Sequence, residues 1–173
     1  LAALGEHYYG AGKESADTGR PVKTLFYVTV STGVGGGVVD NGSVFLGANG
    51  LTGEIGHTLV DTSSSALTCQ CGATGCLEAM ASGTGIERIA RQKVASGDFS
   101  ESVLAEMDAG SLDSEAVFDA AGKNDPLAMS IVAGAVSALA IGLTNVVHLF
   151  NPDMIVLGGG VTQGLVKLDL LPR

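Results

Sequence analysis

The sequence predicts an α/β domain, because strand-like and helix-like stretches are mixed along one chain of 173 residues. The run TLFYVTVST, from Thr24 to Thr32, is rich in β-branched and aromatic residues and predicts a buried strand. A shorter apolar run, Met154–Leu157, predicts another strand before three glycines. Helical spacing dominates much of the sequence between these two runs. The length suits one ordinary domain with a buried core.

The first residues, LAALGEHYYGAG, have helical spacing that places Leu1, Leu4 and Tyr8 on one face. The two glycines at the end of this stretch predict where the helix stops. No Ser, Thr, Asp or Asn precedes Leu1 to cap the helix, so we expect the chain to begin inside an element. The next stretch, residues 13–23, is polar and predicts a loop.

The glycine run GVGGG, residues 33–37, is predicted to break the extended structure, which VVD then resumes. DNGS, Asp40–Ser43, is a type I′ hairpin signal, because Asn-Gly readily adopts the positive φ angles of that turn. VFLG, residues 44–47, is then predicted to return as a strand.

Three helices are predicted in the second half of the chain. Residues 83–97 are amphipathic, and a second helix over residues 112–125 is expected to be capped by Ser114. Pro126 marks the first turn of the third, which runs to Phe150. This last helix is apolar all round, as in a membrane span or a wholly buried helix. Its many Ala, Gly and Val residues and its few polar ones favour a core helix without membrane contact.

The formal net charge of −9 leaves no basic patch for a phosphate backbone, which argues against nucleic-acid binding by this segment. No basic start followed by an apolar middle opens the chain, as a cleavable signal would require. Three cysteines cannot pair evenly, which favours a reducing compartment and a metal role. We therefore expect a cytoplasmic protein.

All three cysteines lie in one short segment. Cys69, Cys71 and Cys76 follow His57, and three thiolates with one imidazole are a suitable ligand set for four-coordinate zinc. Alternate residues of an extended segment point the same way, so Cys69 and Cys71 can hold one ion, while nearby glycines let the chain return Cys76. Such a zinc has no open position and would be structural. The alternative is three thiols without a metal.

Two carboxylates flank the proposed ligands: Glu54 precedes His57 by three residues, and Glu78 follows Cys76 by two. Fixing the ligands would also fix these carboxylates, which can accept hydrogen bonds from the hydroxyls of a sugar or polyol. Two alternatives stay open, namely solvated side chains or a general acid/base pair that needs no zinc.

Two glycine segments could approach a nucleotide. STGVGGG lies between two predicted strands and so lacks the strand-then-helix context of a dinucleotide fingerprint, but its backbone N–H groups could bind a phosphate. VLGGG follows a strand and enters a predicted helix, where glycines would let a base or ribose approach closely. The alternative for STGVGGG is a simple tight turn. The alternative for VLGGG is a site where a helix packs on a strand.

The motifs STGVGGGVVDNG, GANGLTGEIGHTLV, CQCGATGCLEAMASG and NPDMIVLGGGV, in this order, resemble the ROK family of repressors, uncharacterised reading frames and sugar kinases. The resemblance extends from Ser31 to Val161 and implies an actin-like ATPase (ribonuclease H-like) lobe with a mixed sheet, packed helices and a zinc-binding loop.

The resemblance also implies residue roles. The zinc ligands would be His57, Cys69, Cys71 and Cys76. The residues at the sugar would be Glu54, His57 and Glu78, with Asn49 and Gly50 nearby. Thr32, Gly33 and Gly35 would lie at the phosphates of ATP, which binds together with Mg²⁺. Gly158, Gly159 and Gly160 would lie at the adenosine.

One departure from the family pattern concerns catalysis. In the family, an Asn-Asp pair directly precedes the segment that resembles residues 1–12, and its Asp is the catalytic base. We therefore expect residues 1–173 to be part of the larger, C-terminal lobe, without the small lobe, the extreme C-terminus or a catalytic residue, and to be inactive alone.

The complete protein is expected to phosphorylate a hexose or N-acylhexosamine at its 6-hydroxyl, with ATP or polyphosphate as donor, and to form homo-oligomers. Two other hypotheses stay open: the sugar-sensing domain of a ROK-type repressor, and a zinc-stabilised module without a small-molecule site.

Overall fold

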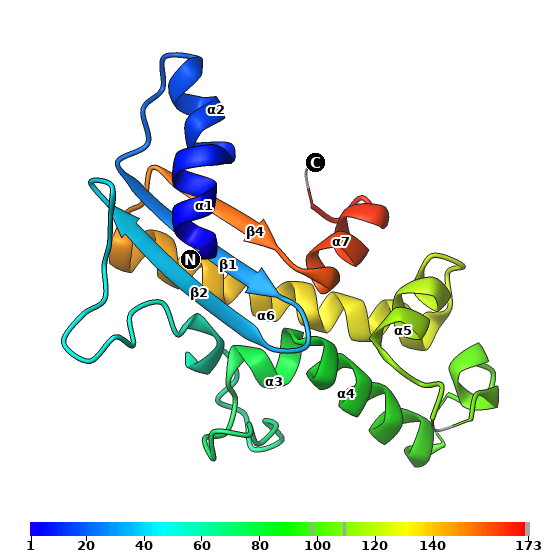
Figure 1. Cartoon of the computed structure of the whole chain (residues 1–173). Helices are drawn as coiled ribbons and strands as arrows, with labels where there is room; N and C mark the ends of the chain where they lie inside the picture. Colours follow the sequence, from blue (N-terminus) through cyan, green and yellow to red (C-terminus); the bar gives the residue numbers. More distant parts are fainter. Residues whose placement is uncertain (98, 109, 172–173) are drawn as a thin grey trace.

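The computed structural model describes residues 1–97, 99–108 and 110–171, and a four-stranded sheet lies at its centre (Figure 1). The strands are β1 (Thr24–Val30), β2 (Val34–Asp40), β3 (Ser43–Val44) and β4 (Met154–Gly158), in the spatial order β3-β2-β1-β4. β2 runs antiparallel to both of its neighbours, whereas β4 runs parallel to β1. The predicted α/β class and mixed sheet are therefore confirmed.

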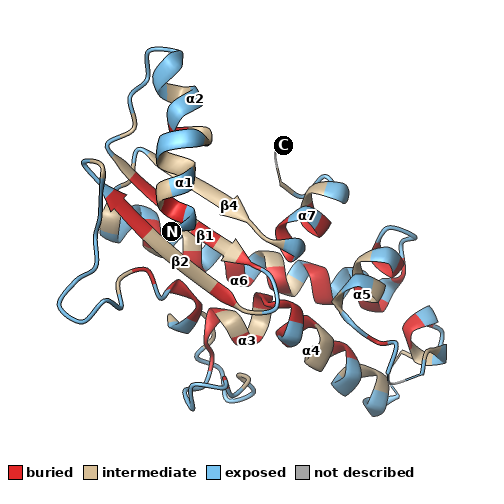
Figure 2. Ribbon diagram, in the orientation of Figure 1, coloured by how far each residue is buried: buried red, intermediate tan, exposed pale blue. Residues whose placement is uncertain are grey.

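β1 is heavily buried because helices cover both faces of the sheet around it (Figure 2). Phe26 and Val28 face the long helix α6 (Pro126–Phe150), and the Phe26 ring meets that of Phe150 edge-on at 5.0 Å between centroids. Leu25 points to the opposite face, where α1 (Ala2–Tyr9) lies. The predicted strand is confirmed, but it ends at Val30 and leaves Ser31 and Thr32 in a turn.

The predicted break is only partly right: the strand breaks at residues 31–33, which include Gly33, but β2 already begins at Val34 and continues through all three following glycines. These glycines are explained by close packing. A Cβ on Gly36 would lie 2.5 Å from the carbonyl oxygen of Gly53, and one on Gly37 would lie 3.3 Å from the Cβ of Ala3 in α1. A loop and a helix thus approach the strand where it has no side chains.

The hairpin after β2 has the predicted turn. Asn41 and Gly42 both have positive φ angles, 47° and 77°, as a type I′ turn requires. The returning strand is shorter than predicted, because β3 contains only Ser43–Val44 and residues 45–47 leave the sheet.

The predicted loop over residues 13–23 is wrong in its first part. A second helix, α2 (Ala11–Asp17), follows α1 after Gly10, so Gly12 lies inside a helix rather than ending one. A Cβ on Gly12 would lie 2.7 Å from the carbonyl oxygen of His7, which explains the glycine at this junction. The buried residue of α1 is Ala3, and the predicted face with Leu1 and Tyr8 is exposed.

α6 is the core helix that the sequence predicted. Asp125 caps it by accepting a hydrogen bond from the Ala128 amide, and Pro126 occupies its first turn. Among the described residues it is the one helix long and apolar enough to cross a membrane, yet one side of it is buried in the domain. The prediction of a helix buried all round is only partly right, because Met129, Ile141, Val147 and Leu149 are exposed.

Of the remaining helices, three pack against α6, and the last one packs against β1 and β4 (Figure 1). They are α3 (Leu77–Ala81), α4 (Gly83–Ser96), α5 (Ser114–Ala121) and α7 (Gly160–Lys167), with 3-10 helices η1 (Ile55–His57) and η2 (Val103–Glu106). The cap of α5 is Asp113, whose side chain accepts from the Ala116 amide, and not Ser114 as predicted.

Candidate functional site

The two glycine segments predicted to approach a nucleotide lie at the same edge of the sheet. β1 and β4 are parallel, so their carboxyl ends are neighbours, and ligands commonly bind at this edge of α/β sheets. The turn at Ser31–Gly33 follows β1, and the turn at Gly158–Gly160 links β4 to α7. Gly159 has a φ of 102°, and a Cβ there would collide with the carbonyl oxygen of Val30. The second turn thus rests directly on the end of β1.

The turn after β1 is held by the start of α4. The Gly83 amide donates to the carbonyl oxygen of Ser31 at 2.7 Å, and the Thr84 hydroxyl donates to that of Thr32 at 2.9 Å. In the part of the chain that the structure describes, the amides of Thr32 and Gly33 have no hydrogen-bond acceptor. Successive free amides in a turn can bind an anion. Gly35 lies inside β2, opposite Thr29, rather than in the turn.

A cavity of about 570 Å³ lies between α5 and α7, next to the second glycine turn. Its volume lies in the range typical of small-molecule sites. Gly160 lines it together with the two lysines Lys123 and Lys167 and the acidic Glu115 and Asp119. These charged residues could not be predicted from the sequence, because nothing in their local pattern indicates that α5 and α7 face each other.

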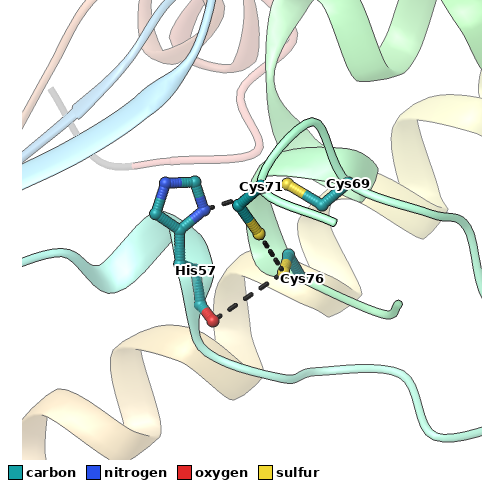
Figure 3. A group of neighbouring side chains, drawn as sticks. All are labelled: His57, Cys69, Cys71 and Cys76. Atoms are coloured by element: carbon teal, nitrogen blue, oxygen red, sulfur yellow. Dashed lines mark hydrogen bonds between the residues drawn. The ribbon is translucent and has the colours of Figure 1, made fainter. Parts of the chain in front are cut away.

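The predicted zinc ligands converge in space (Figure 3). The donor atoms of His57, Cys69, Cys71 and Cys76 all lie within 4.8 Å of one another. The sulfurs of Cys71 and Cys76 are 3.7 Å apart, and Nδ1 of His57 is 3.8 Å from the sulfur of Cys69. Tetrahedral zinc with bonds of about 2.3 Å to sulfur requires sulfur–sulfur distances of about 3.8 Å. The donor set and its spacing therefore fit a closed zinc site.

Local backbone geometry brings the cysteines together. The Cys69 amide donates to the Ala73 carbonyl at 2.7 Å, which closes a small hairpin, the cysteine hairpin, with Cys69 before its turn, Cys71 in the turn and Cys76 after it. Gly72 and Gly75 have φ angles of 91° and 86°, which favour glycine over other residues. Cys76 then lies at the N-terminus of α3.

The environments of the thiols differ. Burial, followed by the neighbouring Cys71 and Cys69, raises the pKa of the Cys76 thiol to about 12. Cys71 is exposed, and a hydrogen bond with the Ala73 backbone, followed by one with Cys69, lowers the pKa of its thiol. Without metal, Cys76 thus keeps its proton at neutral pH. Because zinc binds thiolate, the ion would have to displace that proton.

Glu78 joins the cysteine hairpin to the turn after β1. Its Oε2 accepts a hydrogen bond from the Val34 amide at 2.9 Å, and its Oε1 lies 3.8 Å from the sulfur of Cys69. A Cβ on Gly33 would lie 2.7 Å from Oε2, so the carboxylate fills the space that a side chain there would need. The sequence placed Glu78 beside the cysteines but gave no sign of this contact.

The other predicted sugar residues are more exposed. Glu54 is exposed immediately before η1, which carries His57, and among the described residues it has no hydrogen-bond partner for its carboxylate. Asn49 and Gly50 are exposed in the segment between β3 and η1, where Gly50 has a φ of 74°. The structure therefore brings His57 and Glu78 to the cysteine hairpin and leaves Asn49 and Gly50 without a described contact to it.

Comparison with known proteins identifies relatives along nearly the whole chain. The profile of the ROK family matches residues 1–167. A glucokinase from Halalkalibacterium halodurans is 42% identical over 163 residues, which cover 94% of this chain and 47% of the relative. The chain thus spans about half the length of the curated relative it matches.

Solved structures share the fold. A ROK family glucokinase from Streptomyces griseus, in complex with glucose and AMPPNP, superposes with a TM-score of 0.76 and 28% identity. The match covers 98% of this chain and 53% of that one. A ROK family transcriptional regulator, a homologue of the Escherichia coli MLC protein, superposes with a TM-score of 0.78 and 30% identity, covering 96% of this chain and 39% of that one.

Proposed function

The chain belongs to the ROK family, and we propose that it is part of the larger lobe of a sugar kinase. The complete protein would transfer a phosphoryl group from ATP to the 6-hydroxyl of a hexose or N-acylhexosamine. One observation carries the proposal: Glu78, the carboxylate proposed to bind sugar, accepts a hydrogen bond from Val34, the residue directly after the turn that offers the free amides of Thr32 and Gly33. A sugar site and a phosphate site would therefore share one wall.

The phosphate side would use the turn after β1. Phosphoryl transfer depends mainly on positioning and on stabilising charge, which backbone amides and Mg²⁺ supply. Thr32 and Gly33 would bind phosphate oxygens together with Mg²⁺, and Gly35 would keep the adjoining backbone uncrowded. Gly158, Gly159 and Gly160 would let the adenosine approach, and the cavity between α5 and α7 has room for it.

The sugar side would use the residues around the cysteine hairpin. Zinc bound by His57, Cys69, Cys71 and Cys76 would be structural, since four protein ligands leave no open position. Hydroxyl groups would donate to Glu54 and Glu78, and the ring nitrogen of His57 that does not face the cysteines would contact the sugar. Asn49 and Gly50 would border this site. The general base would be the Asp of the Asn-Asp pair that, in the family, directly precedes the segment resembling residues 1–12.

The test is phosphorylation by the full-length protein. With Mg²⁺-ATP and glucose or N-acetylmannosamine, NMR of the product should show the phosphate on the 6-oxygen. Glu78→Gln should raise KM for the sugar, with zinc content unchanged. If Glu78→Gln leaves the sugar affinity at its original value with zinc retained, the role of this carboxylate is wrong.

A sugar-sensing repressor is the second candidate, because one structural relative is a transcriptional regulator. Two features that a sugar sensor does not need favour the kinase: the free amides of Thr32 and Gly33, and a cavity of nucleotide size lined by Gly160. Sugar-dependent DNA binding by the full-length protein, together with an absence of ATP binding, would select the repressor. We also propose a cytoplasmic homo-oligomer, and size-exclusion chromatography with light scattering tests the assembly.

A further inference from the structure

Arg88, on α4, has a guanidinium group that is only partly hydrogen-bonded. Its Nη1 donates a hydrogen bond of 2.7 Å to the carbonyl oxygen of Thr68, the residue before the first cysteine. Its Nε and Nη2 are buried and have no acceptor among the described residues. Buried donors are nearly always hydrogen-bonded in folded proteins, so these two donor nitrogens indicate a missing partner.

The missing partner can be sought in a small cavity that Arg88 lines. The cavity is about 70 Å³, which is enough for a few water molecules but too small for a sugar or nucleotide. It lies between the cysteine hairpin, α3 and the start of α4, and its polar walls come from Cys69, Gln70, Glu78, Ser82, Thr84 and Arg88. Ser82 already accepts from the Gly85 amide. Cys69 is the wall residue whose charge would change when the proposed metal binds.

Charge also favours a contact between the Arg88 guanidinium and the Cys69 thiolate. Zinc with three thiolates and a neutral imidazole would carry a net charge of −1, and the Glu78 carboxylate adds a second negative charge nearby. In the described part of the chain, Arg88 forms no ion pair with Glu78 or any other carboxylate. Its guanidinium is the cation in the wall of that cavity, and thiolate sulfur accepts hydrogen bonds from such donors.

We propose that Arg88 is a positioning residue of the zinc site: it donates, directly or through one water molecule, to the thiolate of Cys69 and offsets the negative charge of the metal centre. Through its bond to Thr68 it also fixes the hairpin on α4. The proposal rests on the zinc site but not on the identity of the sugar or on kinase activity.

The experiment compares zinc affinity in the full chain and two variants, by competition with a chromophoric chelator. Arg88→Gln should bind zinc about 10- to 100-fold more weakly, as is usual when an outer partner of a metal ligand is lost. Arg91→Gln is the matched control, because Arg91 lies on the same helix and pairs with Glu87 and the Leu112 carbonyl, away from the hairpin. It should stay within about twofold of the original affinity.

A second measurement separates this role from general destabilisation. In the cobalt-substituted protein, loss of a hydrogen bond to a thiolate raises the energy of the sulfur lone pair, so the sulfur-to-cobalt absorption of Arg88→Gln should shift to longer wavelength. Arg91→Gln should show no shift. The proposal would be overturned if Arg88→Gln and Arg91→Gln had equal zinc affinities, whether unchanged or equally reduced, and if neither variant shifted the sulfur-to-cobalt absorption. A chain that binds neither metal at all would instead refute the zinc site itself.

Discussion

At the scale of single residues, backbone geometry alone requires several glycines, whatever ligand they contact. Gly159 is the clearest, because its φ of 102° and its contact with the Val30 carbonyl both exclude a side chain. Gly159→Ala should therefore lower the free energy of unfolding by about 1–3 kcal/mol. Urea unfolding measures this. The matched control is Gly160→Ala, which meets no atom within 4 Å and should stay within about 1 kcal/mol of the original protein. Similar losses in both variants would contradict the explanation.

Three hydrogen bonds stabilise the charged form of Asp125. Burial raises the pKa of its carboxyl group, but hydrogen bonds from the amides of Ala128 and Val103 and the hydroxyl of Ser102 outweigh this effect and lower the pKa overall. A lowered pKa in the folded state means that this stabilisation is fully present above the unfolded value of about 3.9 and is lost as pH falls below it.

Asp125→Asn should accordingly be less stable than the original protein at pH 7, by about 1–3 kcal/mol, because it loses charge-assisted bonds. The difference should stay constant down to about pH 5 and shrink towards pH 3. Urea unfolding of both proteins across this range checks it. An equal difference at pH 7 and pH 3 would show that the charge of Asp125 contributes nothing.

At the scale of elements, local patterns predicted what local interactions determine. The β-branched run of β1, the Asn-Gly turn and the proline at the start of α6 act within a few residues, and each was predicted from the sequence. The convergence of the four proposed zinc ligands was predicted for the same reason, because three of them lie within eight residues of one another.

The features that were not predicted from the sequence depend on contacts between residues far apart in the chain. The glycines of β2 were interpreted as a break because glycine is rare in strands, yet packing against α1 and the Gly53 backbone overrides that preference. Likewise, the bond from the Val34 amide to Glu78 joins residues 44 positions apart, and the cavity between α5 and α7 depends on tertiary packing. Neither has a local signature.

Gly36→Ala tests this explanation of β2. The added Cβ would lie 2.5 Å from the Gly53 carbonyl oxygen and 3.1 Å from the Phe26 ring, so we expect a loss of about 1–3 kcal/mol in unfolding free energy. Gly35→Ala is the control in the same strand, since its Cβ would make only an ordinary contact of 3.6 Å with Thr29. If Gly36→Ala were as stable as Gly35→Ala, close packing would not be the reason for the glycine.

At the scale of the whole molecule, the cysteine hairpin, Glu78 and the turn after β1 form one connected unit. The hairpin carries the three cysteines among the proposed zinc ligands, Glu78 follows the last of them on α3, and its carboxylate is bonded to the Val34 amide. Since zinc must displace the proton of the Cys76 thiol, whose pKa is about 12, zinc affinity should fall steadily as pH is lowered. Chelator competition at pH 8 and pH 6 measures this, and an affinity independent of pH would argue against thiolate ligation by Cys76.

The most direct measurement is the metal content and coordination of the purified chain, by elemental mass spectrometry and zinc X-ray absorption. We predict one zinc ion per chain, bound by three sulfurs at about 2.3 Å and one nitrogen at about 2.0 Å, and lost on Cys76→Ser. A chain purified and reconstituted with zinc that still holds none, or holds it through oxygen ligands, would contradict a metal-fixed hairpin presenting Glu78.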